Sequence, residues 1–119
     1  MITEDYVSFE VAKLLKEKGF VTPCNWLYCS DGTFGHRNSL WDKEMFPAPT
    51  HQMAMKWLRE VHNIYIDISP TYSEVEKTIH FIWQVFDSNY DGIGDCEIFY
   101  GKYEEAVEEA LKYSLEDLI

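Results

Sequence analysis

The residues best suited to chemistry lie in a short acidic stretch, VFDSNYDGIGDCE, at residues 85–97. Its oxygen-bearing side chains follow the pattern D-x-N-x-D-G, which opens an EF-hand calcium loop. The candidate calcium ligands are Asp87, Asn89, Asp91 and Asp95. An EF-hand also needs a bidentate glutamate at the twelfth position of the loop, where this sequence has Ile98. Glu97 comes one residue too early.

The residues around this loop favour a different structure. The preceding segment, TIHFIWQVF, is rich in β-branched and aromatic residues, which are typical of a strand and not of the helix that an EF-hand requires. Asn and Asp tolerate left-handed backbone conformations, and the D-G pair suits a tight reversal. We therefore expect the tip of a β-hairpin with an acidic rim. Loose calcium binding is the alternative, and no other cofactor is expected.

A second group of carboxylates lies on the last predicted helix, residues 102–119, opposite an apolar stripe. The candidate partner-binding residues are Glu104, Glu105, Glu108 and Glu109. Like charges four residues apart on a helix repel each other by about 0.2–0.5 kcal/mol. A solvated helix face is one interpretation of this pattern. A docking surface for a basic protein partner, or an imitation of nucleic-acid charge, is the other.

The remaining reactive side chains form no recognisable catalytic constellation, so we predict that the protein is not an enzyme. The sequence has no nucleophile elbow, HExxH motif or Gly-rich phosphate loop. Its three cysteines are expected to be free thiols. Cys24 and Cys29 are five residues apart on a predicted strand, which places them on opposite faces and disfavours a zinc pair. Asp67 and Glu97, both on predicted strands, could converge as a carboxylate pair.

The net charge of −11 is concentrated near the C-terminus. Residues 87–119 hold ten acidic residues and two lysines, whereas residues 1–86 hold eleven acidic and eight basic residues. Nucleic acids and anionic membranes bind cationic surfaces, so neither is an expected partner. No apolar run reaches the roughly 20 residues that span a bilayer. The N-terminal MITEDYVSFE does not resemble a signal peptide, and a cytoplasmic location is expected.

The periodicity of apolar residues predicts a single α+β domain over residues 1–119, in the order α-β-(β)-α-β-β-β-α. It contains three helices and a largely antiparallel sheet of three to five strands. Helices are predicted in the segments 8–20, 50–62 and 102–119. Ser8 and Thr50 are the expected N-caps of the first two, and Gly19 is the expected stop of the first. The apolar face of the second helix is expected to hold Ala54, Trp57, Leu58 and Val61. The stripe of the third is Tyr103, Ala106, Val107, Ala110, Leu111, Ser114 and Leu118.

Strands are predicted at residues 21–29, with a weak return strand after a D-G turn, and at 63–69, 79–87 and 96–100. Residues 39–49 are expected to be irregular, and residues 69–78 a loop or a short helical turn. Strict alternation in NIYIDIS places three isoleucines on one side of the strand, and Tyr65 and Asp67 on a wet or partner-facing side. The strand at 79–87 is apolar on both sides and is expected to be central.

The chain has 4 Trp, 8 Tyr and 7 Phe, more aromatic rings than a core of this size needs. Some of the following are expected to be exposed: Tyr28, Trp41, Tyr65, Tyr72, Trp83, Tyr90 and Tyr100. Aromatic residues are enriched at protein interfaces, which favours a partner surface or a homodimer. Packing at the boundary of the core is the other explanation.

Three segments together resemble a group of small uncharacterised proteins of Bacteroides-type gut bacteria, their prophages and mobile elements. The segments are SFEVAKLLKEKGF, APTHQMAMKWLREVHNIYIDI and YEEAVEEALKYSLEDLI, about half of the chain, and DSNYDGIGD lies outside them. The group has no established activity, so the resemblance implies a context and no functional residue. We therefore expect an acidic accessory protein of a phage or mobile element that acts as a non-enzymatic protein-interaction module, with calcium binding at residues 87–95 as the alternative.

Overall fold

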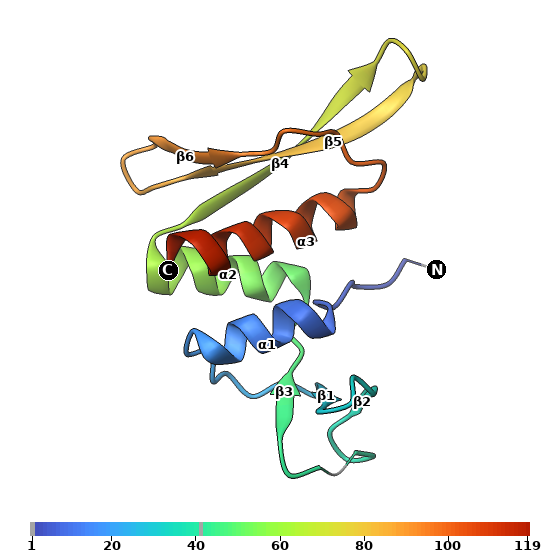
Figure 1. Ribbon diagram of the computed structural model, residues 1–119, viewed down its shortest axis with the longest axis vertical. Coiled ribbons are helices and arrows are strands. Elements are labelled where there is room, and N and C mark those ends of the chain that lie inside the picture. Colours follow the sequence, from blue (N-terminus) through green and yellow to red (C-terminus); the bar gives the residue numbers. More distant parts are fainter. Residues whose placement is uncertain (1, 41) are drawn as a thin grey trace. The chain divides into compact units, whose positions relative to one another are not determined.

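A computed structural model of the chain describes residues 2–40 and 42–119. The chain divides into two compact units, Met1–Ala54 and Met55–Ile119. The α+β class is confirmed, because the described residues form three α-helices and two antiparallel sheets of three strands each (Figure 1). The single domain over residues 1–119 stays a prediction.

The first helix, α1 (Phe9–Glu17), begins and ends where the sequence predicts. The Ser8 hydroxyl accepts a hydrogen bond from the backbone N–H of Val11, so the N-cap is confirmed. Gly19 has a φ of +99°, a left-handed conformation that glycine adopts without strain and that ends the helix. Phe20 then folds back, is buried, and donates its backbone N–H to the carbonyl of Leu15.

The first sheet belongs to the same unit and has the order β2-β1-β3. Its strands are β1 (Trp26–Cys29), β2 (Phe34–His36) and β3 (Met45–Pro47). The hairpin of β1 and β2 turns at the predicted D-G pair, where Gly32 has a φ of +90°. The prediction that residues 39–49 are irregular is wrong for β3, which pairs antiparallel with β1. Pairing with a distant strand decides this conformation, and local sequence does not.

Helix α2 (His51–His62) runs across the boundary between the units. Its N-cap is confirmed, because the Thr50 hydroxyl accepts the N–H of Met53. The predicted apolar face is wrong at Val61, which is 56% exposed, whereas Met55 is buried. The buried stripe is therefore rotated by part of a turn from the predicted one. Asn63, with a φ of +57°, ends the helix in a left-handed conformation.

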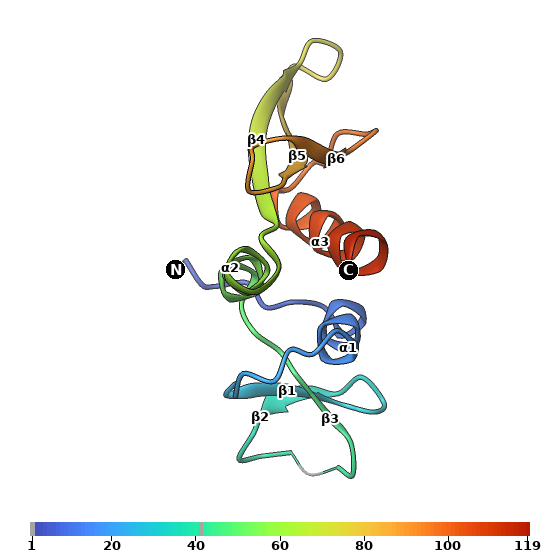
Figure 2. The same ribbon diagram turned by 90° about the vertical axis from the view of Figure 1, so that its left-hand side faces the viewer.

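The second unit contains a sheet with the order β4-β5-β6 (Figures 1 and 2). Its strands are β4 (Tyr65–Ser73), β5 (Thr78–Phe86) and β6 (Gly92–Asp95). The central position of β5 is confirmed. Two other predictions are wrong, because β4 continues through the segment expected to be a loop, and the third strand is GIGD instead of CEIFY.

Both differences have a physical explanation. Pro70 cannot donate a backbone hydrogen bond, but it is tolerated in β4 because this strand is at the edge of its sheet and pairs there with β5 alone. The turn at residues 87–91 is tight, so pairing with β5 resumes at Gly92. In the segment predicted as a strand, Tyr100 keeps an isolated antiparallel bridge to Phe81.

Helix α3 (Tyr103–Tyr113) lies along one face of this sheet and continues as a π-helical turn, Ser114–Leu118 (Figures 1 and 2). Two tyrosines of α3 contact aromatic rings of β5: Tyr113 contacts Trp83 with ring centroids 5.2 Å apart, and Tyr103 contacts Phe81 at 5.8 Å. The predicted apolar stripe is confirmed from Ala106 to Ser114. Leu115 is fully buried in addition, because the wider π turn shifts the buried side by a residue.

Candidate functional site

The loop that resembles a calcium site is a hairpin turn. One carboxylate oxygen of Asp87, Oδ1, accepts the backbone N–H groups of Asn89 at 2.9 Å and Asp91 at 3.1 Å. The backbone N–H of Asp87 donates to the carbonyl of Asp91, and that of Tyr90 to the carbonyl of Asp87, both at 3.0 Å. Tyr90 has a φ of +65°. The segment enters the turn as strand β5, so the helix that would open an EF-hand is not formed.

The predicted calcium ligands are divided between the turn and a strand. Asp87, Asn89 and Asp91 belong to the turn, whereas Asp95 lies on β6 opposite Gln84 of β5. Across residues 2–40 and 42–119, no group of three or more His, Cys, Asp or Glu side chains is placed to hold a metal ion. The geometry therefore gives the calcium hypothesis no support.

The three cysteines are free thiols. Cys24 precedes β1, so the prediction that it shares a strand with Cys29 is wrong. Burial raises the pKa of the Cys29 thiol, and the negative charges of Asp42 and Asp31 raise it further. Burial also raises the pKa of Cys24, against the opposing charge of Arg37. A protonated thiol is a poor nucleophile and a poor metal ligand, so neither chemistry is favoured here.

The acidic face of α3 is only partly open to solvent. Glu105 is exposed, whereas Glu104, Glu108 and Glu109 are half-buried. The Glu109 carboxylate also lies 4.0 Å from the ammonium of Lys112, which offsets part of its charge. Partner binding by these four residues stays a prediction.

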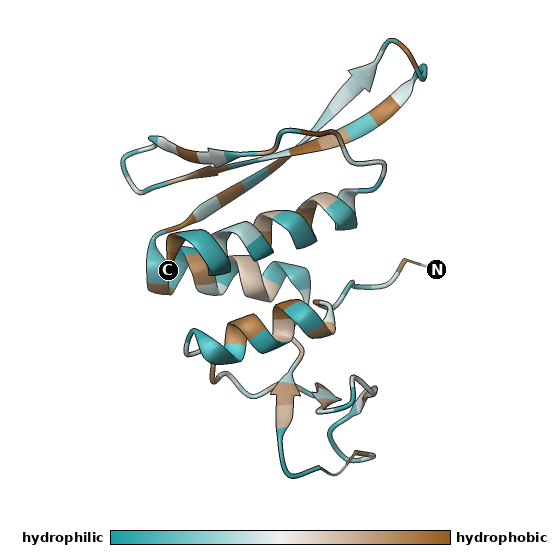
Figure 3. Cartoon of the chain, viewed as in Figure 1, coloured by the Kyte–Doolittle hydropathy of each residue, from teal (hydrophilic) through white to brown (hydrophobic). Residues whose placement is uncertain are grey.

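The β4–β5–β6 sheet has a second face, the outer face, which points away from α3. The inner face is defined by Trp83 and Val85, which are buried, and by Gly94, which lies under the ring of Tyr113. Residues paired across neighbouring strands share a face, and successive residues alternate between faces. Gln84, between the two buried residues, is thus on the outer face and is exposed. Figure 3 shows the resulting alternation of apolar and polar bands along the strands.

The pairing register builds an acidic row across the outer face. Asp67 of β4 lies opposite Gln84 of β5, which in turn lies opposite Asp95 of β6. Neighbouring strands are about 4.8 Å apart, so the two aspartates are separated by roughly 10 Å, with the amide between them. Oδ2 of Asp67 accepts a hydrogen bond from the Ser69 hydroxyl at 2.8 Å, which orients this carboxylate.

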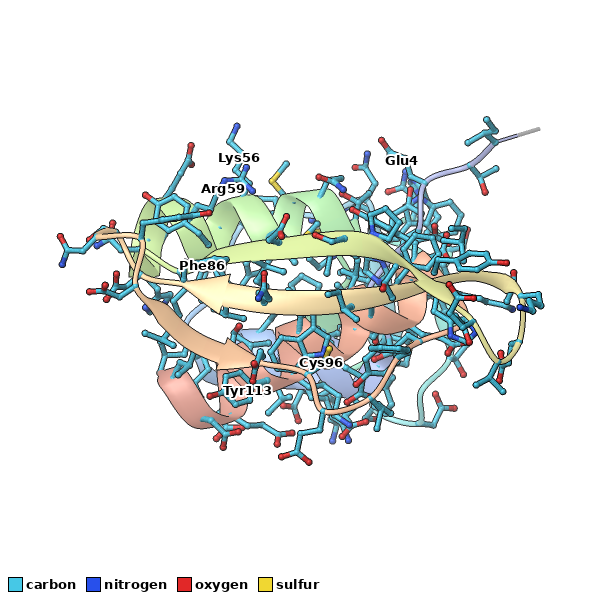
Figure 4. The ribbon with its side chains drawn as sticks, turned by 90° about the horizontal axis from the view of Figure 1, so that it is seen from above. Glu4, Lys56, Arg59, Phe86, Cys96 and Tyr113 are labelled. Atoms are coloured by element: carbon cyan, nitrogen blue, oxygen red, sulfur yellow. The ribbon has the colours of Figure 1, made fainter. Side chains whose placement is uncertain are left out.

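An aromatic row lies next to the acidic row. Tyr65 of β4 pairs with Phe86 of β5, and Figure 4 looks onto this face with Phe86 labelled. The Tyr90 ring stacks on the Phe86 ring with centroids 4.7 Å apart and an angle of 15° between the rings. Tyr65 is 40% exposed and Tyr90 is 80% exposed. The outer face thus presents large apolar rings to solvent beside carboxylates.

Two hollows flank the ridge made by Gln84 and Phe86. The larger, which we call the Tyr90 cleft, has a volume of about 510 Å³ and is lined by Tyr65, Ile66, Asp67, Gln84, Phe86, Asp87, Ser88 and Tyr90. The smaller, about 200 Å³, is lined by Gln84, Phe86, Gly92, Gly94 and Asp95. Aspartate side chains line both hollows, and no lysine or arginine is among the described residues that line either one.

Part of this surface was predicted from the sequence. The alternation that placed Tyr65 and Asp67 together on a wet or partner-facing side is confirmed in that both residues are exposed to solvent. Of the seven aromatic residues singled out, Tyr65, Tyr72 and Tyr90 are exposed, whereas Trp83 is buried. Tyr28 and Tyr100 are half-buried, and Trp41 lies outside the described residues.

Two residues of the outer face were missed, and the carboxylate in line with Asp67 differs from the one considered. Gln84 and Phe86 were not recognised, although their shared side of β5 was the available signal. The sequence left open a pairing of Asp67 with Glu97, and the register places Asp67 in line with Asp95. Glu97 lies in the bend that follows β6.

A comparison of the chain with known protein families, curated proteins and solved structures finds no match. No helix within residues 2–40 and 42–119 is long and apolar enough to cross a membrane.

Proposed function

We propose that this protein is a non-enzymatic interaction module that binds a basic segment of another protein. The observation that supports this most directly is the outer face of the β4–β5–β6 sheet. Helix α3 packs against the opposite face, and the outer face combines exposed rings with the carboxylates of Asp67 and Asp95. Aromatic side chains supply much of the binding energy at protein interfaces, and a surface of one charge favours a partner of the other.

The charge of the whole chain supports the same partner chemistry. A net charge of −11 attracts cationic proteins over distances of about a Debye length, roughly 8 Å at physiological ionic strength, and raises their rate of encounter. The same charge repels nucleic acids and anionic membranes. The resemblance of three segments to small proteins of mobile elements supports a role as an accessory protein of a phage or mobile element.

The proposal is tested with two short peptides, one of alternating lysine and serine and one of alternating glutamate and serine. We expect the full chain to bind the lysine peptide and not the glutamate peptide, as measured by fluorescence anisotropy. The affinity should fall steeply as salt rises from about 0.01 M to about 1 M, because the Debye length shortens from about 30 Å to about 3 Å. Equal binding of both peptides, or binding of neither, would contradict the proposal.

The two candidate surfaces are separated by charge-neutralising variants. Asp67→Asn with Asp95→Asn should weaken binding of the lysine peptide, because these carboxylates form the acidic row. Glu105→Gln, on the exposed side of α3, is the matched control and should leave the affinity unchanged. The opposite result would move the binding surface to α3 while keeping the basic partner.

A further inference from the structure

The stacked pair of Phe86 and Tyr90 has a fixed geometry. Phe86 ends β5, and Tyr90 follows in the hairpin turn. The backbone N–H of Tyr90 donates to the carbonyl of Asp87, and the carboxylate of Asp87 holds the next amide, that of Asp91. These bonds keep Tyr90 at a φ of +65° and its ring nearly parallel to Phe86. A tyrosine that is 80% exposed is thus held in one place by a turn.

A carboxylate and an amide lie beside this ring pair. Asp67 and Gln84 line the Tyr90 cleft together with Phe86 and Tyr90. Asp67 keeps its orientation through the hydrogen bond from Ser69, which occupies one of its two oxygens. The cleft volume of about 510 Å³ is within the range of about 300–1,000 Å³ that is typical of ligand pockets. Among the described residues that line the cleft, none is a cation that could neutralise Asp67.

Flat rings beside a carboxylate match one protein side chain better than any other. The guanidinium of arginine is planar, stacks on aromatic faces, and forms paired hydrogen bonds with a carboxylate. The ammonium of lysine is compact and strongly hydrated, and it offers neither the flat face nor the fork. We infer that the Tyr90 cleft binds an arginine side chain of the partner's basic segment, with the guanidinium against the Tyr90–Phe86 pair and hydrogen-bonded to Asp67. This inference rests on the proposed function, because it specifies the basic partner.

The inference is tested by changing only the basic residue of the probe. Three peptides alternate serine with arginine, lysine or citrulline, the neutral analogue of arginine with nearly the same shape. We expect the arginine peptide to bind the full chain more tightly than the lysine peptide by about five- to tenfold, and the citrulline peptide to bind least. In nuclear magnetic resonance spectra, the arginine peptide should shift the backbone amide signals of Gln84 and Tyr90 most.

Variants of the protein test the same contacts. Tyr90→Ala should weaken binding of the arginine peptide by about two- to thirtyfold, the range that corresponds to a cation–π contact. Tyr90→Phe keeps a ring and should retain the affinity. Tyr72→Ala is the matched control. Tyr72, on β4, is likewise an exposed tyrosine, at 51%, but its pairing with Ile79 places it on the inner face.

The outcomes separate this inference from the proposed function. If the lysine and arginine peptides bind equally and Tyr90→Ala has no effect, the arginine site is refuted, although a basic partner still stands. If neither basic peptide binds, both proposals are refuted. Weaker binding by Tyr72→Ala to the same extent as by Tyr90→Ala would also refute the cleft as the specific site.

Discussion

Gly94 offers the sharpest test of how the second unit is packed. A Cβ atom at this position would lie 2.8 Å from Cζ and 2.9 Å from the hydroxyl of Tyr113, and closer still to Cε1 of the same ring. The ring cannot simply move aside. It packs on Trp83 with centroids 5.2 Å apart, and its hydroxyl donates to the carbonyl of Ile93 at 3.0 Å. Gly94→Ala must therefore displace a ring that is held at two points.

The expected loss of stability follows from three contributions. Overpacking costs about 1–3 kcal/mol, and loss of the hydrogen bond to Ile93 costs about 0.5–1.5 kcal/mol. Replacing glycine by alanine in a strand returns about 0.5–1 kcal/mol, because the unfolded chain becomes less flexible. We expect Gly94→Ala to lower the free energy of unfolding by about 2 kcal/mol.

Urea unfolding followed by tryptophan fluorescence measures this loss, because Trp83 reports on the Tyr113 contact. Gly92→Ala is the matched control in the same strand. The nearest atom to its added Cβ, Cε1 of Phe86, is 4.0 Å away, which is ordinary contact. With no clash, only the backbone contribution remains, and we expect this variant to raise the free energy of unfolding by about 0.5–1 kcal/mol.

A double-mutant cycle then assigns the cost to the ring. In a Tyr113→Ala background the space is open, so Gly94→Ala should cost little, and the coupling between the two sites should be about 1–3 kcal/mol. Two results would refute the reasoning. One is a Gly94→Ala variant as stable as Gly92→Ala, and the other is a cost that persists without the Tyr113 ring.

Three further predictions follow from local contacts. Ser8→Ala should lower the free energy of unfolding by about 1 kcal/mol in urea titrations, because it removes the N-cap bond from Val11. Backbone and side-chain hydrogen bonds from Ser30 hold the pKa of Asp42 below its usual range. The ionised Asp42 therefore stabilises the fold at pH values above its pKa in the unfolded chain, and this contribution is lost as pH falls through its pKa in the folded protein. Ser30→Ala should raise the folded-state pKa of Asp42, as measured by a carbon-13 titration. Millimolar calcium should give no heat in calorimetry, because Asp87 is engaged by backbone amides.

The helices were predictable because their signals are local. Ser8 and Gly19 mark the ends of α1 in the sequence, and the structure uses them in those roles. The burial of α2 was only partly predictable. Val61 fits an apolar stripe as well as Met55 does. Tertiary packing decides which of them is buried, and helical periodicity does not determine that packing.

The strands were harder to predict, because they depend on contacts between distant segments. Segment β3 has few strand-forming residues and is ordered by pairing with β1, a contact between distant parts of the chain. Strand β4 passes through Pro70, which normally argues against a strand, because the position at the edge removes the need for its N–H. Such contacts are not visible in a local pattern.

The surface proposed for binding could be predicted in part. The alternation in β4 correctly placed Tyr65 and Asp67 on one open side. Their neighbours depend on register, and the register between β5 and β6 shifts at an irregularity between Val85 and Phe86. Periodicity in the sequence does not predict that shift. The alignment of Asp67, Gln84 and Asp95 across three strands is therefore known only from the structure.

Pro70 has a further consequence for association between copies of the chain. A nine-residue strand that pairs within its sheet on one side alone is a template on which another chain could extend the ladder. The missing N–H interrupts any such ladder near the middle of β4, so that neither half is long enough to seed a fibril. One imino acid thus protects a long edge strand, part of the proposed binding surface, against self-templated aggregation.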